Sequence, residues 1–424
     1  MNAQTSQQMD KAAVIHFGSH STVAGFSNRE LPQCVSPSAY LRTVGGDTIF
    51  GLYPLLQATE GDLYVLFDNR GVPTDWEMLE KFLRWIYSTQ LRVDTTEVAL
   101  CVTVPPDLSP AVKNQFHELA LCRLGVPVFQ LISEPLAVTF SLGKTTALVV
   151  DVGAAKATVT PVVDGGVVKN GIMRSRFAGD FLDYQLQQAV EGVDDSQGSL
   201  HQWQQSRTWV YDFKNTMLQV SPMRLSEVEK QLQQSMGIIP IPIEGKKNFV
   251  LRREKVITWE LKQCYHIAEG LFDPSIVSQE FDRADGLGEI VGKAVKKCAA
   301  SVTSNGTTGG GSAAGGGGIS SVSAAATAAA MGPTSTATPE QIHAALLTNV
   351  VLIGGTSLLQ GLEQRLVYEL NLQFPQYKLL TYATPVYIDR QLQSWQGGVN
   401  MCHLPYWKLG SWMSKQEYLD SLEK

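Results

Sequence analysis

The sequence predicts a mixed α/β fold in which two similar halves enclose a nucleotide cleft. Three observations favour this fold class. The chain has 424 residues, of which 44% are hydrophobic, and this is enough to build two or more domains with cores of their own. Outside one low-complexity segment, strand-like and helix-like runs alternate. A strand, a glycine turn and a second strand occur twice, at residues 13–26 and 147–165. Two such hairpins can face each other and hold the phosphates of a nucleotide between them.

The first helix signal lies between residues 74 and 91. Residues 74–77 (TDWE) predict a capping box at the helix start. The helix that follows places large apolar side chains on one face, namely Met78, Phe82, Trp85 and Ile86. This apolar face predicts that the helix packs against a core.

Alternating strands and helices follow. Residues 98–106 (VALCVTVPP) are typical of a buried strand, and Ser109-Pro110 start a helix that Gly125 ends. Residues 126–132 (VPVFQLI) predict the next strand, and the stretch SEPLAVTFSL begins another helix. The order indicates α/β units in this half of the chain.

The second hairpin is VVDVGAAKATVTP, at residues 149–161. Small residues let backbone N–H groups approach an anion closely, so this turn suits a phosphate. Such a site normally also needs an acidic side chain for a divalent metal. The turn offers Ala154 and Ala155 instead, which leaves two alternatives: the acid lies elsewhere, or the chemistry has been lost.

One segment differs from the rest of the chain. Residues from Ser301 to Gln341 consist mainly of Gly, Ser, Ala and Thr, with too few apolar side chains to offset the entropy of ordering. We therefore expect a disordered insertion at about residues 299–338. Thr338-Pro339-Glu340 is a favourable helix start, so an ordered chain resumes there.

Charge and cysteine content exclude several function classes. The formal net charge is -6, which gives no general attraction to nucleic acid, and the short basic clusters at residues 246–247, 252–253 and 296–297 are more typical of solvated faces. The six cysteines show no C-x-x-C pair and no zinc spacing, as in reduced intracellular proteins. The N-terminus has no signal-peptide pattern, and no apolar run reaches the roughly 18 residues that span a bilayer.

Four stretches together carry a resemblance to a known family. They are IHFGSHSTVAGF, VVDVGAAKATVTP, VVLIGGTSLLQGLEQRL at residues 350–366, and the C-terminal run SWQGGVNMCHLPYWKLGSWMSKQEYLDSL. In this order they resemble the actin family over nearly the whole chain except the insertion. The resemblance implies an actin-like (ribonuclease H-like) duplicated fold, with two lobes around a nucleotide cleft.

The resemblance also implies how the chain is divided. Subdomain 1 would comprise residues 1–36, 67–142 and 393–424, and a short subdomain 2 residues 37–66. Subdomain 3 would comprise residues 143–177 and 281–392, with the insertion inside it. Subdomain 4 would comprise residues 178–280.

Carried over residue by residue, the family's ATP cleft is partly kept. The residues that match it are Gly18, Ser19, Asp151, Gly153, Lys214, Gly354, Gly355 and Thr356. The resemblance implies that this is a degenerate ATP cleft, in which no cofactor is required and ATP is at most a weak or structural ligand. The alternative for the glycines is that they permit close packing of strand against helix.

The family's metal and phosphate contacts are largely replaced. The metal-facing aspartates fall on His16 and Ala154, the phosphate lysine on Val23, and the water-orienting glutamine on Glu134. On the purine side, Asn215, Leu359 and Gln391 replace the family's glutamate, tyrosine and basic residue. We therefore predict no catalytic residue, no metal site and no enzymatic activity.

Three points of this site remain open from the sequence. His16 and His20 have H-x-x-x-H spacing, but on a strand and turn they are more typical of packed or hydrogen-bonded histidines than of metal ligands. Asp151 either orders water around a metal or accepts hydrogen bonds within its turn. Glu134 can in principle act as a base, although its charge repels a triphosphate.

Within the family, the likeness is to fungal actin-related proteins that are subunits of SWI/SNF and RSC-type chromatin remodelling complexes. Stretches such as GGVVKNGIMRSRFAGDFLDYQ and QFPQYKLLTYA carry it. The class implies a nuclear scaffold that forms a heterodimer with a second actin-related protein and binds the helicase/SANT-associated helix of the motor ATPase. Other remodeller subunits would be further partners, with no membrane contact and nucleic acid only indirectly bound.

A helix-binding groove would follow from this role. We expect it at residues 138–142 and around Leu370, Leu372 and Phe374, although these apolar residues also suit a core. The competing functions are an active ATPase or kinase of the same fold, a filament-forming cytoskeletal protein, and a subunit that binds DNA directly.

Overall fold

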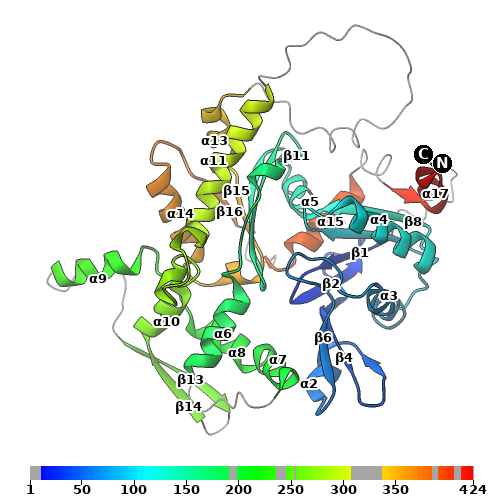
Figure 1. Cartoon of the computed structure of the whole chain (residues 1–424), viewed down its shortest axis with the longest axis horizontal. Helices are drawn as coiled ribbons and strands as arrows, with labels where there is room; N and C mark the ends of the chain where they lie inside the picture. The colour runs from blue at the N-terminus through cyan, green and yellow to red at the C-terminus, as the bar shows by residue number, and fades with distance from the viewer. Residues whose placement is uncertain are drawn as a thin grey trace.

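The computed structural model has two lobes, each built on its own sheet (Figure 1). It describes residues 11–190, 198–234, 245–252, 255–306, 337–383, 390–404 and 412–423. The two-lobed α/β architecture that the sequence predicts is confirmed. In that part of the chain, no helix has the length and apolar character needed to cross a membrane.

The small lobe is built on a six-stranded sheet. Its strand order is β17-β8-β7-β1-β2-β3, and the strands are β1 (Ala12–Phe17), β2 (Ser21–Phe26), β3 (Cys34–Pro37), β7 (Ala99–Val104), β8 (Val128–Ser133) and β17 (Met413–Ser414). Strand β1 pairs antiparallel with β2 and parallel with β7. Alternate residues of β1 enter different cores, with Ile15 on one face and Val14 on the other, which explains its continuous apolar run. The predicted strands at 98–106 and 126–132 are confirmed as β7 and β8.

The large lobe repeats this arrangement. Its sheet has the order β11-β10-β9-β15-β16, with β12 paired to β10, and the strands are β9 (Ala147–Val152), β10 (Ala157–Val163), β11 (Gly166–Val167), β12 (Met173–Ser175), β15 (Val350–Ile353) and β16 (Thr381–Ala383). Strand β9 pairs antiparallel with β10 and parallel with β15, just as β1 does with β2 and β7. The repeated hairpin in the sequence therefore reflects a duplicated sheet topology.

Two helices of the small lobe end in π-helical turns. Helix α3 (Trp76–Trp85) continues as η1 (Ile86–Leu91), and α4 (Pro110–Glu118) continues as η2 (Leu119–Leu124). Gly125 ends the second one, as predicted, in a left-handed conformation with φ of 72°. In both, the apolar stripe carries through the π-helical turn, because Ile86 and Leu121 are fully buried.

The predicted capping box at residues 74–77 is wrong in its details. Asp75, not Thr74, is the N-cap, and its carboxylate accepts hydrogen bonds from the backbone N–H groups of Glu77 and Met78 at 2.9 and 3.1 Å. The Thr74 hydroxyl instead donates to the Val65 carbonyl at 2.7 Å. Because the threonine is engaged by a neighbouring strand, the helix starts one residue later than the sequence predicts.

Two helices lie close together between the lobes. Helix α15 (Gln393–His403) crosses α5 (Glu134–Ser141), and a Cβ on Gly397 would lie 2.9 Å from the Ala137 carbonyl carbon. A Cβ on Gly398 would lie equally close to the Val14 side chain. Gly397 therefore permits the approach of α15 to α5, and Gly398 permits its approach to β1. The Trp395 indole N–H fixes the helix by donating to the Val14 carbonyl at 3.0 Å.

The start of the predicted insertion is misplaced. Helix α11 (Leu287–Gly306) continues through residues that the sequence assigned to the disordered segment at about 299–338. Ala299 and Val302 are buried, because they extend the apolar stripe of Val291, Val295 and Cys298 by further helical turns. Residues 307–336 of the predicted insertion lie outside the described residues.

The predicted helix start after the insertion is confirmed. Thr338 caps α13 (Pro339–Leu347) in a reciprocal capping box with Gln341, and Pro339 occupies the first helical position. Helix α13 then packs against α11. The two ends of the segment thus return to the same side of the large lobe (Figure 1).

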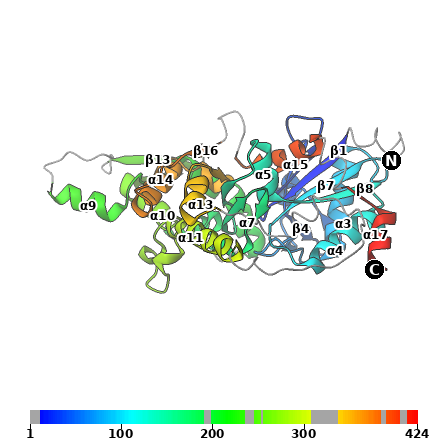
Figure 2. The ribbon, with the colours of Figure 1, turned by 90° about the horizontal axis from the view of Figure 1, so that it is seen from above.

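Smaller units complete each lobe. On the small lobe these are α2 (Leu52–Gln57) and a three-stranded sheet of β4 (Ala39–Arg42), β5 (Thr48–Ile49) and β6 (Asp62–Val65). On the large lobe they are α6 (Gly179–Ala189), α7 (Ser199–Arg207), α8 (Trp209–Met217), α9 (Leu225–Gln234), α10 (Leu261–Glu269) and the hairpin β13 (Lys246–Arg252) with β14 (Lys255–Glu260). Figure 2 shows α9 and α17 (Lys415–Leu422) at opposite ends of an elongated molecule. The subdomain boundaries stay predictions.

Candidate functional site

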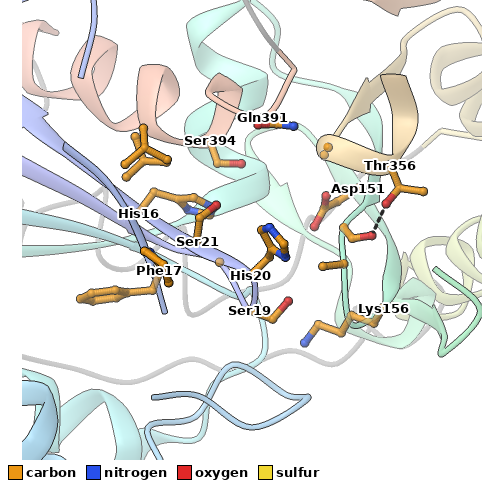
Figure 3. Close-up of a pocket in the computed structure, with 18 of the residues that line it drawn as sticks. His16, Phe17, Ser19, His20, Ser21, Asp151, Lys156, Thr356, Gln391 and Ser394 are labelled. Atoms are coloured by element: carbon orange, nitrogen blue, oxygen red, sulfur yellow. Dashed lines mark hydrogen bonds between the residues drawn. The ribbon is translucent and has the colours of Figure 1, made fainter. Parts of the chain in front are cut away.

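A cavity of about 350 Å³ lies between the two hairpins (Figure 3). This is in the size range of small-molecule sites. Both hairpins line it, together with α5, α8, the turn after β15 and the start of α15. The duplicated sheets therefore place the two glycine turns on opposite walls of one cavity.

All of the site residues predicted from the sequence line this cavity. They are Gly18, Ser19, Asp151, Gly153, Lys214, Gly354, Gly355 and Thr356. The residues that replace the family's contacts line it as well, and these are His16, Val23, Ala154, Glu134, Asn215, Leu359 and Gln391. The structure thus brings together residues that are far apart in the chain, from His16 to Gln391. Whether this set binds a nucleotide stays a prediction.

The first hairpin is closed by its own backbone and by β7. The Gly18 N–H donates to the Ser21 carbonyl at 3.1 Å, which makes the tight turn. The His16 ring nitrogen Nδ1 lies 2.9 Å from the Thr103 hydroxyl. Burial lowers the pKa of His16, although Glu134 acts against the shift. A hydrogen-bonded imidazole whose neutral form is favoured therefore lies where the sequence predicts the metal-facing position.

The second hairpin keeps one acid, Asp151, whose pKa is shifted from its ordinary value. Burial raises the pKa of Asp151 well above its ordinary value, and the nearby Glu134 raises it further, while Lys156 opposes the shift. The Glu134 carboxylate in turn accepts a hydrogen bond from the Ser394 hydroxyl. This electrostatic environment favours a proton on Asp151, which weakens it as a partner for a cation.

The sequence left two roles open for Asp151, ordering water around a metal or accepting hydrogen bonds within its turn. The turn's own hydrogen bond runs from the Gly153 N–H to the Lys156 carbonyl at 3.1 Å, and the Ala155 N–H donates to the Ser19 hydroxyl at 3.3 Å. Within the described residues, no turn N–H donates to the Asp151 carboxylate. The hydrogen bonds of the turn therefore do not account for this aspartate.

The residues present do not form a metal centre of their own. In the described part of the chain, no three His, Cys, Asp or Glu side chains are grouped so that they could hold an ion. Magnesium prefers several oxygen ligands with charged carboxylates among them. The combination of neutral His16, a protonation-prone Asp151 and Ala154 is a poor fit to that preference.

The glycine turn after β15 has a structural reason of its own. Gly354 has φ of 91°, and a Cβ there would collide with the Asp151 carboxylate and the Val152 carbonyl. The Thr356 hydroxyl donates to the Gly153 carbonyl at 2.7 Å (Figure 3). This turn is thus fastened directly to the second hairpin, as the close-packing alternative for these glycines requires.

On the presumed purine side, the one retained cation is already paired. The Lys214 ammonium lies 2.6 Å from the Asp183 carboxylate, and both side chains are nearly buried. Burial raises the pKa of Asp183, and Lys214 opposes this shift. A ligand that used Lys214 would therefore have to compete with an internal ion pair.

Two cationic residues of the cavity escaped the sequence reasoning. Lys156 follows the second turn, and its ammonium is buried without a hydrogen-bond partner among the described residues. Arg207, at the end of α7, donates to the His20 carbonyl at 2.6 Å. Lys156 belongs to the second hairpin, so the sequence could have indicated it. Nothing in the sequence around Arg207 indicates the cleft, because only the tertiary fold brings α7 there.

The prediction that residues 138–142 and those around Leu370 border a helix-binding groove is wrong. Leu370 and Phe374 are buried in the large-lobe core, and only Leu372 is exposed, at 49%. Residues 138–142 pack elsewhere, since Val138 and Leu142 belong to a separate cluster with β9 and β15. These residues serve two different cores, so they do not border one groove.

Comparisons with known proteins agree with this geometry. The family model described as Actin matches residues 7–305 and 318–422. Actin-related protein 7 of Saccharomyces cerevisiae is 40% identical, over 96% of this chain and 95% of that protein. Actin-related protein 4 of Eremothecium gossypii is 26% identical over 96% and 94% of the two chains. The SWI/SNF and RSC complexes subunit arp42 of Schizosaccharomyces pombe is 25% identical over 96% and 95%.

Proposed function

The chain belongs to the actin family, and from this premise we propose that it is a non-catalytic scaffold subunit of an ATP-dependent chromatin remodelling complex. The observation that carries the proposal is the cleft itself. Its walls keep the two glycine turns on opposite sides of one cavity. His16, Val23 and Ala154 also line the cavity, at positions where metal and phosphate contacts would be needed. The fold is retained and the chemistry is not.

The free energies of the missing contacts support the proposed loss of ATP turnover. A hydrogen bond to a charged group contributes roughly 1.5–3 kcal/mol, and removal of one preorganised electrostatic group lowers a rate by about a hundredfold or more. Here two acids and a lysine are replaced together, and they would act on the same phosphates. The remaining acid, Asp151, has its pKa raised by burial, so it does not compensate for them.

The proposed partners follow from the class of relative. One relative is named as a subunit of the SWI/SNF and RSC complexes, and the 40% identical protein is an actin-related protein. We propose a heterodimer of this chain with a second actin-related protein, bound to the helicase/SANT-associated helix of the motor ATPase and regulating its activity. A role in transcription and a location in the nucleus are part of the same proposal.

ATP has at most a weak or structural role in this proposal. The cavity is large enough for a small ligand, and the turn at residues 354–356 is intact. However, Lys214 is held by Asp183, and Leu359 and Gln391 replace the family's purine contacts. No cofactor is therefore required for the scaffold.

The decisive experiment is recovery of the protein from its own cells under mild conditions, followed by identification of the proteins that accompany it. A remodeller motor and a second actin-related protein in stoichiometric amounts are the expected result. Recovery of the chain without such partners, and with an enzymatic activity of its own, would contradict the scaffold proposal.

The competing function is ATP hydrolysis with Glu134 as a base. It is favoured by one observation, the proximity of Glu134 to Asp151 that raises the pKa of the latter. A magnesium-dependent turnover assay on the purified chain distinguishes the two, with no release of phosphate above background expected. Robust turnover that is lost in Glu134→Ala would establish the enzyme instead.

A further inference from the structure

Helix α7 of the large lobe reaches across the cleft mouth to the small lobe. Figure 1 shows α7 beside α2 at the lower end of the molecule. The contact is made by Gln204, whose amide N–H group donates to the Leu55 and Ala58 carbonyls at 3.0 and 2.9 Å. These groups belong to elements about 146 to 149 residues apart in the chain, so the contact joins the two lobes.

The acceptors of Gln204 are carbonyls that need a donor. The last carbonyls of a helix have no partner within the helix, and Leu55 and Ala58 lie in the last turn and at the C-cap of α2. The Leu55 side chain is fully buried. Gln204 thus acts as an external C-terminal cap, supplied by the opposite lobe.

Arg207, one turn further along α7, makes a second connection. It donates to the His20 carbonyl in the turn of the first hairpin at 2.6 Å, and its guanidinium lies 4.9 Å from the centre of the Trp203 ring. Burial lowers the pKa of Arg207 to about 10, while Asp180 and Asp183 oppose the shift. The side chain therefore stays charged at neutral pH, and a charged donor makes a stronger hydrogen bond.

The floor of the cleft is joined as well. The Ala155 N–H of the second hairpin donates to the Ser19 hydroxyl of the first at 3.3 Å. On the adjoining side, Arg174 of β12 lies 2.5 Å from Asp107, which follows β7. Protein contacts thus link the lobes between the two hairpins, where a bound nucleotide would otherwise be the bridge, and also beside that position.

We propose that Gln204 and Arg207 form a latch that keeps the cleft closed without nucleotide. The latch makes the relative position of the lobes a property of the chain alone, as a scaffold requires. This inference rests on the proposed non-catalytic function, because an enzyme of this fold has to open its cleft to exchange ligands. It adds a regulatory consequence, namely that ATP does not control the shape of the scaffold.

Amide hydrogen exchange on the full chain, purified with the subunits that accompany it, tests the latch. The reporters are residues 51–58 around α2 and residues 16–22 in the first hairpin. Gln204→Glu keeps the size of the side chain but replaces the donor by a carboxylate that repels the α2 carbonyls. Arg207→Gln removes the charged donor. In each variant we expect about tenfold faster exchange in its reporter, the factor that loss of one or two net hydrogen bonds supplies.

The matched control is Gln202→Glu, which makes the same change at an exposed side chain of the same helix. It should exchange like the wild type, and magnesium ATP should not slow exchange in the wild-type reporters. Wild-type rates in both latch variants, or protection that appears only with ATP, would overturn the latch. Faster exchange in the core strands β7 and β9 as well would also overturn it, because the contacts would then support the whole fold.

This outcome is separable from that of the proposed function. Recovery of remodeller subunits with the chain tests the scaffold, whereas the exchange rates report only on the cleft mouth. A chain without remodeller partners whose reporters still behave as expected would contradict the function and leave the latch in place.

Discussion

At the scale of single residues, three polar side chains of the cleft are bound to the protein itself, whereas Lys156 has no hydrogen-bond partner among the described residues. His16 is hydrogen-bonded to Thr103, Lys214 is paired with Asp183, and Arg207 is bonded to the His20 carbonyl. In a phosphate site such groups would be kept available for the ligand. Internal partners lower the desolvation penalty of a closed cleft, and they do so without a bound anion.

His20 gives a prediction at this scale. Burial lowers its pKa well below the ordinary value of 6.5, and Arg207 and Lys214 lower it further. The unfolded chain therefore binds a proton near pH 6.5 that the folded chain does not bind, so stability falls as the pH drops below that value. Between pH 7 and 5 this single group contributes a loss of up to about 2 kcal/mol.

His20→Gln should remove that loss while keeping the backbone carbonyl that Arg207 uses. We expect the variant to lose less stability than the wild type between pH 7 and 5, measured as the change in thermal unfolding midpoint. Equal pH slopes for the two proteins would show that His20 is not held neutral in the folded state.

At the scale of elements, a buried ionic network joins α10 to α14 (Leu362–Gln373). The Arg365 side chain is 1% exposed and contacts Glu269 of α10, while its Nε donates to Glu369 at 2.9 Å. Burial alone would raise the pKa of Glu369, but hydrogen bonds from Arg224 and Arg365 outweigh it and leave the pKa lowered. Arg365 also donates to the Met223 carbonyl at 2.9 Å, so one side chain fixes three segments of the large lobe.

Removing the centre of this network should be costly. Arg365→Met keeps much of the volume but leaves Glu269 buried without its cation and Glu369 with Arg224 alone, and breaking such a buried pair typically costs about 3–5 kcal/mol. The measurement is the free energy of unfolding of the large lobe in urea.

Arg283→Met is the matched control, because Arg283 is 44% exposed and lies 3.8 Å from Asp273. An exposed pair contributes about 0–1 kcal/mol. Comparable losses in the two variants would mean that the buried network is offset by its own desolvation and does not hold the elements together.

At the scale of the whole molecule, the lobes are connected by α5 and α15 between them and by α7 at the mouth. The close crossing of α5 and α15 depends on Gly397, and the mouth contact depends on Gln204. Closure is thus supported at both ends of the cleft. The scaffold function and the latch both require this rigidity.

The effect of ligand on stability provides the prediction at this scale. A ligand that binds only the folded state at a hundred times its dissociation constant stabilises it by about 2.7 kcal/mol. Because His16 and Ala154 line the cavity and are predicted to stand at the metal-facing positions, magnesium should add nothing to any stabilisation that ATP gives.

The measurement compares the thermal unfolding midpoint with ATP and magnesium against the midpoint with ATP and a chelator. The same value is expected in both solutions. A magnesium-dependent rise would contradict the loss of the metal site and revive the enzyme function.

Local signals in the sequence predicted much of the architecture. Strand runs at residues 98–106 and 126–132, the end of a helix at Gly125 and its restart at Thr338 were all correct, because they depend on hydrophobic period and on residues with strong turn or cap preferences. The repeated hairpin predicted the duplicated sheet, since each copy folds locally. The identity of the cleft residues also followed from the sequence.

Other features depended on contacts between distant segments. The helix cap is Asp75 and not Thr74, because the Thr74 hydroxyl is hydrogen-bonded to strand β6. Helix α11 extends to Gly306, because Val302 is buried in the core of the large lobe. Leu370 and Phe374 proved to be core residues for the same reason. An apolar side chain in a sequence does not say which surface will cover it.

The sequence by itself therefore determined the family and the two-lobed fold, and it predicted which residues replace acids and a lysine in the cleft. These depend on which residues stand at which positions. The tertiary structure alone decided which polar groups in the cleft satisfy one another and that Gln204 and Arg207 reach the opposite lobe. Those contacts join residues separated by about 146 to 187 positions, and their geometry exists only once both lobes have folded.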